Sequence, residues 1–343
     1  MVVRPRPRLL TRFPRYSLDT TSQTPRRLAA ISIRHKRDQE NYEFVTSSVP
    51  EQSAAVGLAA AFPFRSAFAE TNLPIGVQLY TVQDELKKDA TATLAALAKI
   101  GYREVESFPI QEIPPAQLRK MLDDAGLKCP SAHLFFGLAD TGQLLEQANT
   151  LGAHYAVSSV LLHTTLPGFN ADKMRETIKA FTLDDFKKVA AKANEIGAQA
   201  KKAGLQYAYH NHNFEFRDYD GHTGYEVLLS ETDPALVKFE LDCGWMVTSG
   251  HNPIDYFSKY PGRYPLMHAK DFPADTPITT NLGVDPKHPP TEVGRGHIDF
   301  KPIIAAAEKS GLQHIFVEQD PPIAGMSSIE AVRISYQTLR PLV

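Results

Sequence analysis

The polar and apolar positions of the chain repeat one unit several times: a helical pattern, a glycine, and then a short apolar run. A glycine directly after a helix supplies a left-handed residue without steric cost. Short apolar runs between helices are typical of parallel strands that are covered on both faces. We therefore predict parallel strand–helix units with five glycine joints, which are Gly101, Gly126, Gly152, Gly204 and Gly311.

Eight strands of this kind can be placed along the chain. Their predicted bounds are 75–80, 103–106, 128–133, 154–160, 206–211, 237–241, 264–268 and 314–318. The predicted helices include 90–100, 115–125, 171–181, 183–203 and 327–339. Eight strand–helix units in about 250 residues predict a closed (β/α)8 TIM barrel. The alternative is an open doubly wound sheet, but the G-x-G-x-x-G turn of that fold is missing here.

Residues 1–69 do not follow this pattern, and we exclude them from the barrel. They are rich in Arg, Pro, Ser and Thr, and an apolar stretch at 53–64 precedes the small residues Ala67 and Ala69. An apolar core that ends in A-x-A is typical of a secretory signal. We predict a non-globular extension with a signal cleaved after Ala69, a single domain over 70–343, and export to the periplasm. A buried core helix and a transit peptide are the alternatives, and the protein would be cytoplasmic if the signal did not function.

Composition and charge narrow the class of protein. Of the 343 residues, 43% are hydrophobic and 22% are charged, which is enough apolar sequence for a large core. Residues 1–69 hold eleven Lys or Arg against five Asp or Glu, a net +6, so the rest of this chain of net −2 carries −8. An acidic body makes nucleic acid an unexpected partner. No apolar run reaches about 18 residues, so we expect no stable membrane span. The sequence does not give the oligomeric state.

The two cysteines, Cys129 and Cys243, are too few for a disulfide scaffold or a cysteine-rich zinc site. We assign them to the third and sixth strands, which lie on opposite sides of a barrel. Both are therefore expected to be buried and unpaired.

Polar residues gather at the ends of the predicted strands, where this fold places its catalytic groups. The densest subset is His210, Asp242, His268 and Glu318, from the fifth to the eighth strand, which are neighbours in the ring. Two imidazoles and two carboxylates suit Mn²⁺, Co²⁺, Zn²⁺ or Fe²⁺ better than Ca²⁺. We predict that these four residues bind one divalent cation. The alternative is a hydrogen-bonded polar cluster without a metal.

Further candidates surround this subset. Glu318, Lys270 and His133 are candidate catalytic residues. A carboxylate can remove a proton, and an ammonium group can donate to a developing oxyanion or a leaving group. Lys270 could instead be a surface lysine or a partner of Asp271, and His133 a packed hydrogen-bonding residue. Candidates for binding the hydroxyl groups of a substrate are Gln78, Glu106, His212, Glu292 and Arg295.

Short motifs at the strand ends follow one another in order: GVQLY at 76–80, SAH at 131–133, YHNH at 209–212, ELD at 240–242, HAKD at 268–271, TEVGRG at 291–296 and VE at 317–318. Together they resemble the xylose isomerase-like TIM-barrel superfamily, the group of sugar phosphate isomerases and epimerases, over residues 73–339. This resemblance implies one divalent metal held by Glu, Asp, His and Glu from strands five to eight. Asp242, His268 and Glu318 match the last three, but His210 stands where the family has its first Glu.

The resemblance implies a metal-dependent isomerase or epimerase that removes a proton beside the carbonyl of a keto sugar. Epimerases of this family are understood to use the two metal-bound glutamates on opposite faces of the sugar. A metal-bound neutral imidazole cannot act as a base, so His210 puts this pair in doubt. The alternatives are a 3-keto-glycoside lyase or hydratase, which needs one base, and a non-catalytic exported sugar-binding protein. A small carbohydrate is the expected partner in each case.

Overall fold

The structure is a computed structural model of the full chain. It describes residues 73–343 except 111–112, 138, 162–173, 284, 322 and 324. The predicted extension and signal at 1–69 lie outside the described residues. So do the first three residues of the predicted helix 171–181.

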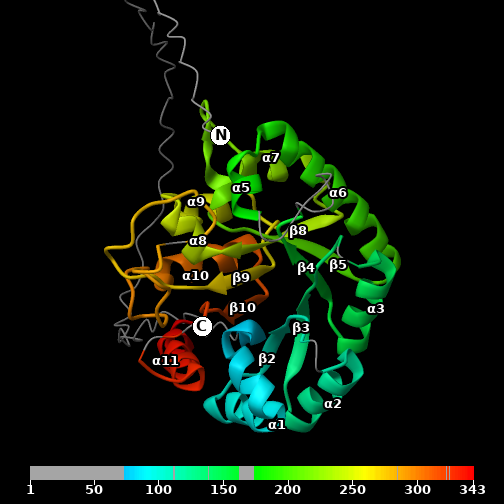
Figure 1. The fold of residues 1–343 in the computed structure, drawn as a ribbon, viewed down its shortest axis with the longest axis vertical. Coiled ribbons are helices and arrows are strands. Elements are labelled where there is room, and N and C mark those ends of the chain that lie inside the picture. The colour runs from blue at the N-terminus through cyan, green and yellow to red at the C-terminus, as the bar shows by residue number, and fades with distance from the viewer. Residues whose placement is uncertain are drawn as a thin grey trace, which may run out of the picture. The chain divides into compact units, whose positions relative to one another are not determined.

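The described strands close into one parallel barrel with the order β1-β10-β9-β8-β5-β4-β3-β2. Figure 1 shows this ring with helices arranged outside it. The barrel strands are β1 (Ile75–Gln78), β2 (Glu104–Ser107), β3 (Lys128–His133), β4 (Tyr155–Ser159), β5 (Gln206–His210), β8 (Val237–Asp242), β9 (Leu266–Ala269) and β10 (His314–Val317). Each overlaps one predicted strand, so the predicted (β/α)8 barrel is confirmed. A short antiparallel pair, β6 (Asp218–Tyr219) and β7 (His222–Thr223), lies outside the ring.

Helices follow the strands along the chain. They are α1 (Gln83–Ile100), α2 (Pro115–Ala125), α3 (Thr141–Leu151), α5 (Met174–Lys179), α6 (Leu183–Lys202), α7 (Gly224–Glu231), α8 (Cys243–Thr248), α9 (Pro253–Lys259), α10 (Phe300–Ser310) and α11 (Ser328–Leu339). The first predicted helix, 90–100, is too short because α1 begins at Gln83. Asp89 interrupts α1 with extended backbone angles, and its side chain accepts the backbone N–H of Ala92 at 2.9 Å. The predicted helix is therefore the part of α1 that a local cap restarts.

The five glycine joints have the backbone conformation that the sequence predicts. Their φ angles are 130° at Gly101, 71° at Gly126, 74° at Gly152, 79° at Gly204 and 98° at Gly311. Side chains other than glycine rarely adopt these angles. The joints turn the chain from helix to strand, and so they set where each strand begins.

The barrel interior is filled by apolar side chains below the predicted site. Tyr155, Val157, Ala208, Leu266 and Phe316 form a separate buried cluster from strands β4, β5, β9 and β10. Side chains two residues apart on a strand share a face. The residues two positions after Ala208, Leu266 and Phe316 therefore point inward, one layer nearer the C-terminal end of the barrel. These residues are His210, His268 and Glu318.

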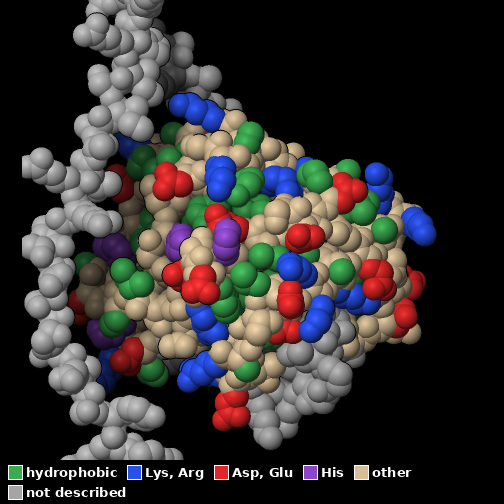
Figure 2. All heavy atoms as spheres, turned by 90° about the horizontal axis from the view of Figure 1, so that it is seen from above, with side chains coloured by type: hydrophobic (Ala, Val, Ile, Leu, Met, Phe, Trp, Pro, Cys, Tyr) green, Lys and Arg blue, Asp and Glu red, His purple; other side chains and the backbone are tan. Residues whose placement is uncertain are grey.

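Both cysteines are free and buried, as expected. Cys129 lies in β3, but Cys243 is the first residue of α8 and not part of a strand. Within the part of the chain that the structure describes, no helix has both the length and the apolar character to cross a membrane. On the face drawn in Figure 2, Lys and Arg side chains are interspersed with Asp and Glu.

A glycine in β1 makes room for the apolar cluster. Gly76 pairs with Phe316, and a Cβ on Gly76 would lie 2.4 Å from Cδ1 of that ring. We expect Gly76→Ala to lower the free energy of unfolding by about 1–3 kcal/mol, because the ring has no room to move aside. Urea unfolding measures this loss. In a Phe316→Leu background the same substitution should cost less, and equal costs in both backgrounds would contradict the explanation.

Candidate active site

The four predicted ligands come together at the C-terminal end of the barrel. His210 ends β5, Asp242 ends β8, His268 lies in β9, and Glu318 directly follows β10. One ligand atom from each lies within 4.8 Å of the other three. All four residues are buried. The side-chain amide of Asn211 accepts the backbone N–H of Asp242 at 3.0 Å and donates to the backbone carbonyl of Asp242 at 3.3 Å. These two bonds fix the ends of β5 and β8 against each other.

One buried carboxylate oxygen of this cluster has no hydrogen-bond partner, which is the feature that a cation would satisfy. Asp242 Oδ1 accepts the backbone N–H of Trp245 at 2.8 Å, but Oδ2 accepts no hydrogen bond from any residue that the structure describes. Oδ2 lies 3.9 Å from Nε2 of His210 and 3.8 Å from Nδ1 of His268. An unpaired buried oxygen is costly, and burial raises the pKa of Asp242 to about 6. The donor set therefore fits a divalent transition-metal ion.

Lys270 is buried against carboxylates. Its Nζ lies 2.7 Å from Glu318, 2.8 Å from Asp320 and 3.5 Å from Asp242. It also lies 4.5 Å from the centre of the Trp245 ring. Burial opposes its charge, but the three carboxylates raise the pKa of Lys270, so the ammonium form persists. Lys270 is therefore not a surface lysine, and its carboxylate partners are residues other than Asp271, so both alternatives from the sequence are wrong.

A second carboxylate layer lies one step deeper in the barrel. Glu240 is two residues before Asp242 on β8 and is fully buried. Its Oε2 lies 2.8 Å from Nε2 of His133, 3.1 Å from Nδ1 of His210 and 3.2 Å from Nε2 of His268. Burial opposes its charge, yet His268 and the other two imidazoles hold the pKa of Glu240 well below its usual range. Glu240 is therefore an ionised acceptor beneath the ligands.

Glu106 belongs to the same layer. It accepts from Nε2 of His268 at 2.7 Å, from Ser131 Oγ at 2.5 Å and from Gln78 Nε2 at 3.2 Å. Burial and the nearby charge of Glu240 raise the pKa of Glu106. The two predicted hydroxyl-binding residues Gln78 and Glu106 thus contact each other and are almost fully buried.

The two remaining histidines have different environments. Burial opposes the charge on His133, but Glu106 and Glu240 raise its pKa above the usual value. His212 is stacked on Trp245, with ring centres 5.7 Å apart, and its Nδ1 has no hydrogen-bond partner. Burial and the neighbouring His210 hold the pKa of His212 well below its usual range, so it is neutral. Both lie beside the predicted ligands.

The loop that carries Glu292 and Arg295 is held by Asp271. The carboxylate of Asp271 accepts four backbone N–H groups, from Phe272, Gly294, Gly296 and Ile298, at 2.9 to 3.1 Å. A Cβ on Gly296 would lie 2.1 Å from Asp271 Oδ1, so this close approach requires glycine.

Glu292 and Arg295 differ in exposure although they pair with each other at 3.6 Å. The side chain of Arg295 is 51% exposed, whereas that of Glu292 is 6% exposed. Glu292 also accepts from Nε2 of Gln319, the residue after Glu318, at 3.5 Å. The loop thus reaches the end of β10.

Glu215 supports the segment that carries His212. Its carboxylate accepts the hydroxyl of Tyr209 at 2.9 Å and the backbone N–H of His212 at 2.9 Å. The side chain is fully buried, and burial raises the pKa of Glu215 to about 8.

Four residues of this site are not among the predicted site residues: Glu240, Trp245, Asp320 and Glu215. Strand alternation was the available signal for Glu240, since it must share a face with Asp242. Asp320 and Trp245 become relevant only through Lys270, whose burial the sequence does not reveal. Nothing in the pattern around Glu215 indicates that it folds back under His212.

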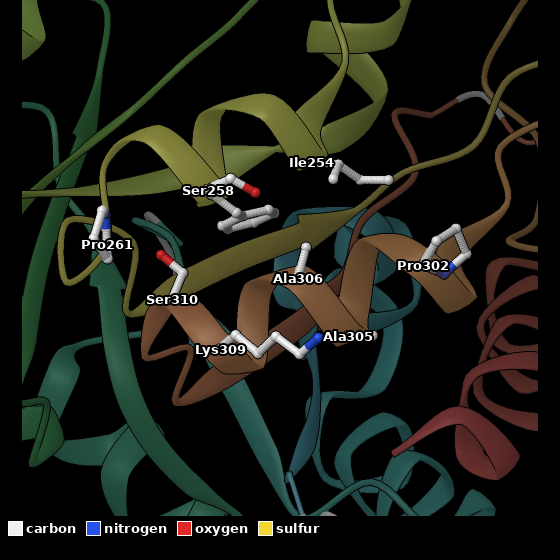
Figure 3. Close-up of a pocket in the computed structure, with 9 residues that line it drawn as sticks. Ile254, Ser258, Pro261, Pro302, Ala305, Ala306, Lys309 and Ser310 are labelled. Atoms are coloured by element: carbon white, nitrogen blue, oxygen red, sulfur yellow. The ribbon is translucent and has the colours of Figure 1, made fainter. Parts of the chain in front are cut away.

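A groove elsewhere lacks this chemistry. It lies between α9 and α10 and has a volume of about 450 Å³ (Figure 3). Its one titratable lining residue is Lys309, and it contains none of the predicted site residues. The candidate active site is therefore the polar cluster at the strand ends.

We expect Asp271→Asn to loosen the loop at 291–298. An amide nitrogen cannot accept, so up to two of the four backbone N–H groups would lose their acceptor. The free energy of unfolding should fall by about 1–3 kcal/mol, and amide hydrogen exchange should quicken at 291–298. Asp299→Asn is the matched control, because Asp299 accepts one N–H at the start of α10 and Asn caps helices equally well. Unchanged exchange at 291–298 in Asp271→Asn would contradict this role.

Glu215 should make stability depend on pH. Its raised folded pKa means that the folded state holds the proton more tightly than the unfolded state, where the pKa is near 4.5. Its contribution is complete below pH 4.5 and is lost as pH rises through about 8, by at most ~1.4 kcal/mol per pH unit. Glu215→Gln should therefore gain stability relative to wild type between pH 5.5 and 8.5 in urea unfolding. Glu146→Gln, on the exposed face of α3, is the control. A parallel pH dependence of Glu215→Gln and wild type would contradict this assignment.

Comparison with known proteins places this site in a family. A sequence model of the xylose isomerase-like TIM barrel matches residues 94–333. The inosose dehydratase of Lacticaseibacillus casei is 33% identical over 262 residues, which is 69% of this chain and 85% of the relative. A solved sugar phosphate isomerase/epimerase from Parabacteroides distasonis is 28% identical, with a TM-score of 0.63 over 81% of this chain and 97% of that one.

A further comparison, with a more distant solved structure, concerns the fold alone. The IOLI protein, solved with a bound zinc atom, is 17% identical with a TM-score of 0.56, over 79% of this chain and 98% of that one. The family model alone spans more than half of the present sequence. This chain belongs to the xylose isomerase-like TIM barrel family.

Proposed function

We propose that the protein is a divalent-metal-dependent lyase that eliminates an oxygen substituent β to the carbonyl of a keto sugar or keto cyclitol. The carrying observation is that His210, which by the resemblance described above stands where the family has its first glutamate, has Glu240 at 3.1 Å from its Nδ1. The other carboxylate that the mechanism needs, Glu318, forms an ion pair with the ammonium group of Lys270 at 2.7 Å. This pair suits a reaction with one base and one acid.

The side chains of the chain can carry the proton through the reaction. A cation at the cluster would polarise the substrate carbonyl and so acidify the adjacent C–H bond. Glu318 is ionised and therefore has a free lone pair for that proton, because Lys270 and His268 outweigh its burial and hold its pKa well below the usual range. As the C–H electrons form the C=C bond, the β C–O bond breaks. Lys270 can then donate a proton to the departing oxygen.

The same pair can reset itself. After donation Lys270 is neutral and Glu318 is protonated, and their atoms are 2.7 Å apart. Transfer of the proton from Glu318 to Lys270 restores both charges. The proton that leaves the carbon thus replaces the one carried away by the leaving oxygen, and no further reactant is needed.

The relatives support this type of chemistry. The curated relative is named a dehydratase, which denotes the loss of water from a hydroxylated carbon. The solved neighbour at 28% identity is named an isomerase/epimerase and favours a second candidate. Isomerisation would begin with the same proton removal and end with a proton returned to carbon. The two candidates therefore differ in where the proton goes.

Aromatic side chains at the mouth favour a ring-shaped substrate. Tyr80 and Phe135 follow β1 and β3, and they are 37% and 53% exposed. Phe108 follows β2 and packs edge-on against Tyr80, with ring centres 5.4 Å apart. Exposed apolar side chains beside a polar cluster are typical of binding surfaces. The apolar face of a sugar or cyclitol ring would fit such a rim.

The test is turnover by the full chain loaded in turn with Mn²⁺, Co²⁺, Zn²⁺ or Fe²⁺ in D₂O. The substrates are a keto inositol and a 3-keto glycoside with a chromogenic aglycone. We expect an unsaturated ketone with release of water or of the aglycone. Glu318→Gln should lower kcat by about 10²–10⁴-fold, and Asp242→Ala should lose the metal. Glu146→Gln is the matched surface control.

Other outcomes contradict the proposal. An epimer or isomer that carries deuterium on carbon, without elimination, would identify an isomerase. Metal binding with neither exchange nor elimination on any of these sugars would identify a binding protein. Full activity of Asp242→Ala would remove the cluster from the reaction.

A further inference from the structure

Two possible donor sets overlap in the barrel. The upper set is His210, Asp242, His268 and Glu318, and the lower set is His133, His210, Glu240 and His268. The two sets share His210 and His268. Each of these two imidazoles faces the upper set with one ring nitrogen and the lower set with the other. Any cation has to be placed in one of them.

The distances distinguish the two sets. In the lower set, Glu240 Oε2 has three imidazole nitrogens at 2.8 to 3.2 Å, which is hydrogen-bond distance. In the upper set, Asp242 Oδ2 has no hydrogen-bond partner and lies 3.8 and 3.9 Å from the two shared imidazoles. The lower set is thus closed by hydrogen bonds to Glu240. In the upper set Nδ1 of His268 contacts Glu318 at 3.1 Å, but Nε2 of His210 and Oδ2 of Asp242 remain 3.9 Å apart, which leaves space for an ion.

We propose that Glu240 is a positioning residue that selects the metal-binding ring nitrogens, Nε2 of His210 and Nδ1 of His268. An imidazole that donates N–H from one nitrogen presents a lone pair at the other. Glu240 accepts from Nδ1 of His210, and it lies 3.2 Å from Nε2 of His268, which also donates to Glu106. Both lone pairs therefore point to Asp242 and Glu318. Carboxylates that hold the other nitrogen of a ligand histidine raise its basicity and fix its orientation. This inference requires the metal centre of the proposed function but not its reaction.

Glu240 and Glu106 do not have the same role. Glu106 accepts from His268 at 2.7 Å and is itself held by Ser131 and Gln78. Glu240 contacts both shared imidazoles, and it is the hydrogen-bond partner of His210 Nδ1. Loss of Glu240 should therefore free His210 most, while Glu106 still orients His268.

The arrangement also fixes the stoichiometry. A second ion in the lower set would need lone pairs on the nitrogens that donate to Glu240. Each shared imidazole would then have lost both ring protons to ligate two ions. We therefore expect one ion per chain.

The test compares Glu240→Gln with Glu104→Gln in the full chain. Glu104 is also a carboxylate bonded to an imidazole, with Oε2 2.7 Å from Nδ1 of His314, and it lies at the start of β2, remote from the ligands. Titration with Zn²⁺ and Co²⁺ against a competing chelator gives the affinity. We expect about 10–100-fold weaker binding in Glu240→Gln and no change in Glu104→Gln. The visible spectrum of bound Co²⁺ should change in Glu240→Gln alone.

The wild-type protein provides a second measurement if Glu240→Gln fails to fold. Nitrogen-15 NMR of the Zn²⁺-loaded chain should show protons on His210 Nδ1 and His268 Nε2. Binding of His210 through Nδ1, two ions per chain, or an unchanged affinity of Glu240→Gln would each overturn the inference. Elimination activity is read separately: a chain with the expected nitrogens but no elimination would refute the proposed function and leave this inference standing.

Discussion

The burial of negative charge at the C-terminal end of the barrel is the constraint on which the site depends. Glu106, Glu240, Asp242 and Glu318 are each at most 8% exposed. Carboxylates in such a place must be protonated, hydrogen-bonded or paired with positive charge. Lys270 is the permanent cation among them, and the imidazoles supply further donors. Among the described residues, Oδ2 of Asp242 accepts no hydrogen bond, and Lys270 approaches it only to 3.5 Å. A divalent cation would complete the compensation at this point.

Much of the fold follows from local sequence, because glycine joints and strand alternation are properties of short segments. The five glycines locate the strands, and alternation then directs His210, His268 and Glu318 into the barrel above the apolar cluster. The four predicted ligand residues could be grouped from the sequence, since each lies at or near the end of one of four successive strands of the ring. The pairing of Lys270 with Glu318 could not be predicted from the sequence, because it depends on the relative depth of two strands in the barrel. Nor does the sequence indicate that Asp271 holds the loop at 291–298 through four backbone contacts.

The site is built in three layers along the barrel axis. Apolar side chains of the cluster around Phe316 exclude water from below. Glu106 and Glu240 form a middle layer that accepts hydrogen bonds from the imidazoles. Asp242 and Glu318 lie above, with Lys270 beside them. Because inward positions on a strand are two residues apart, β8 supplies both Glu240 and Asp242, and β10 leads from Phe316 to Glu318. The rigid sheet therefore fixes Glu240 against Asp242, while Lys270 and Glu318 lie directly after β9 and β10.

The residue at position 210 and the residue at position 240 depend on each other. A glutamate at position 210, which the resemblance to the family would place there, would lie close to Glu240, whose Oε2 is 3.1 Å from Nδ1 of the present imidazole. Two ionised carboxylates so close in a buried site are strongly unfavourable, so one would have to hold a proton or be replaced. His210 removes this conflict and turns Glu240 into an acceptor. The same exchange removes one carboxylate from the substrate side. The imidazole at position 210 and the charged layer beneath it are thus one structural feature, and the ion pair of Lys270 with Glu318 lies beside them.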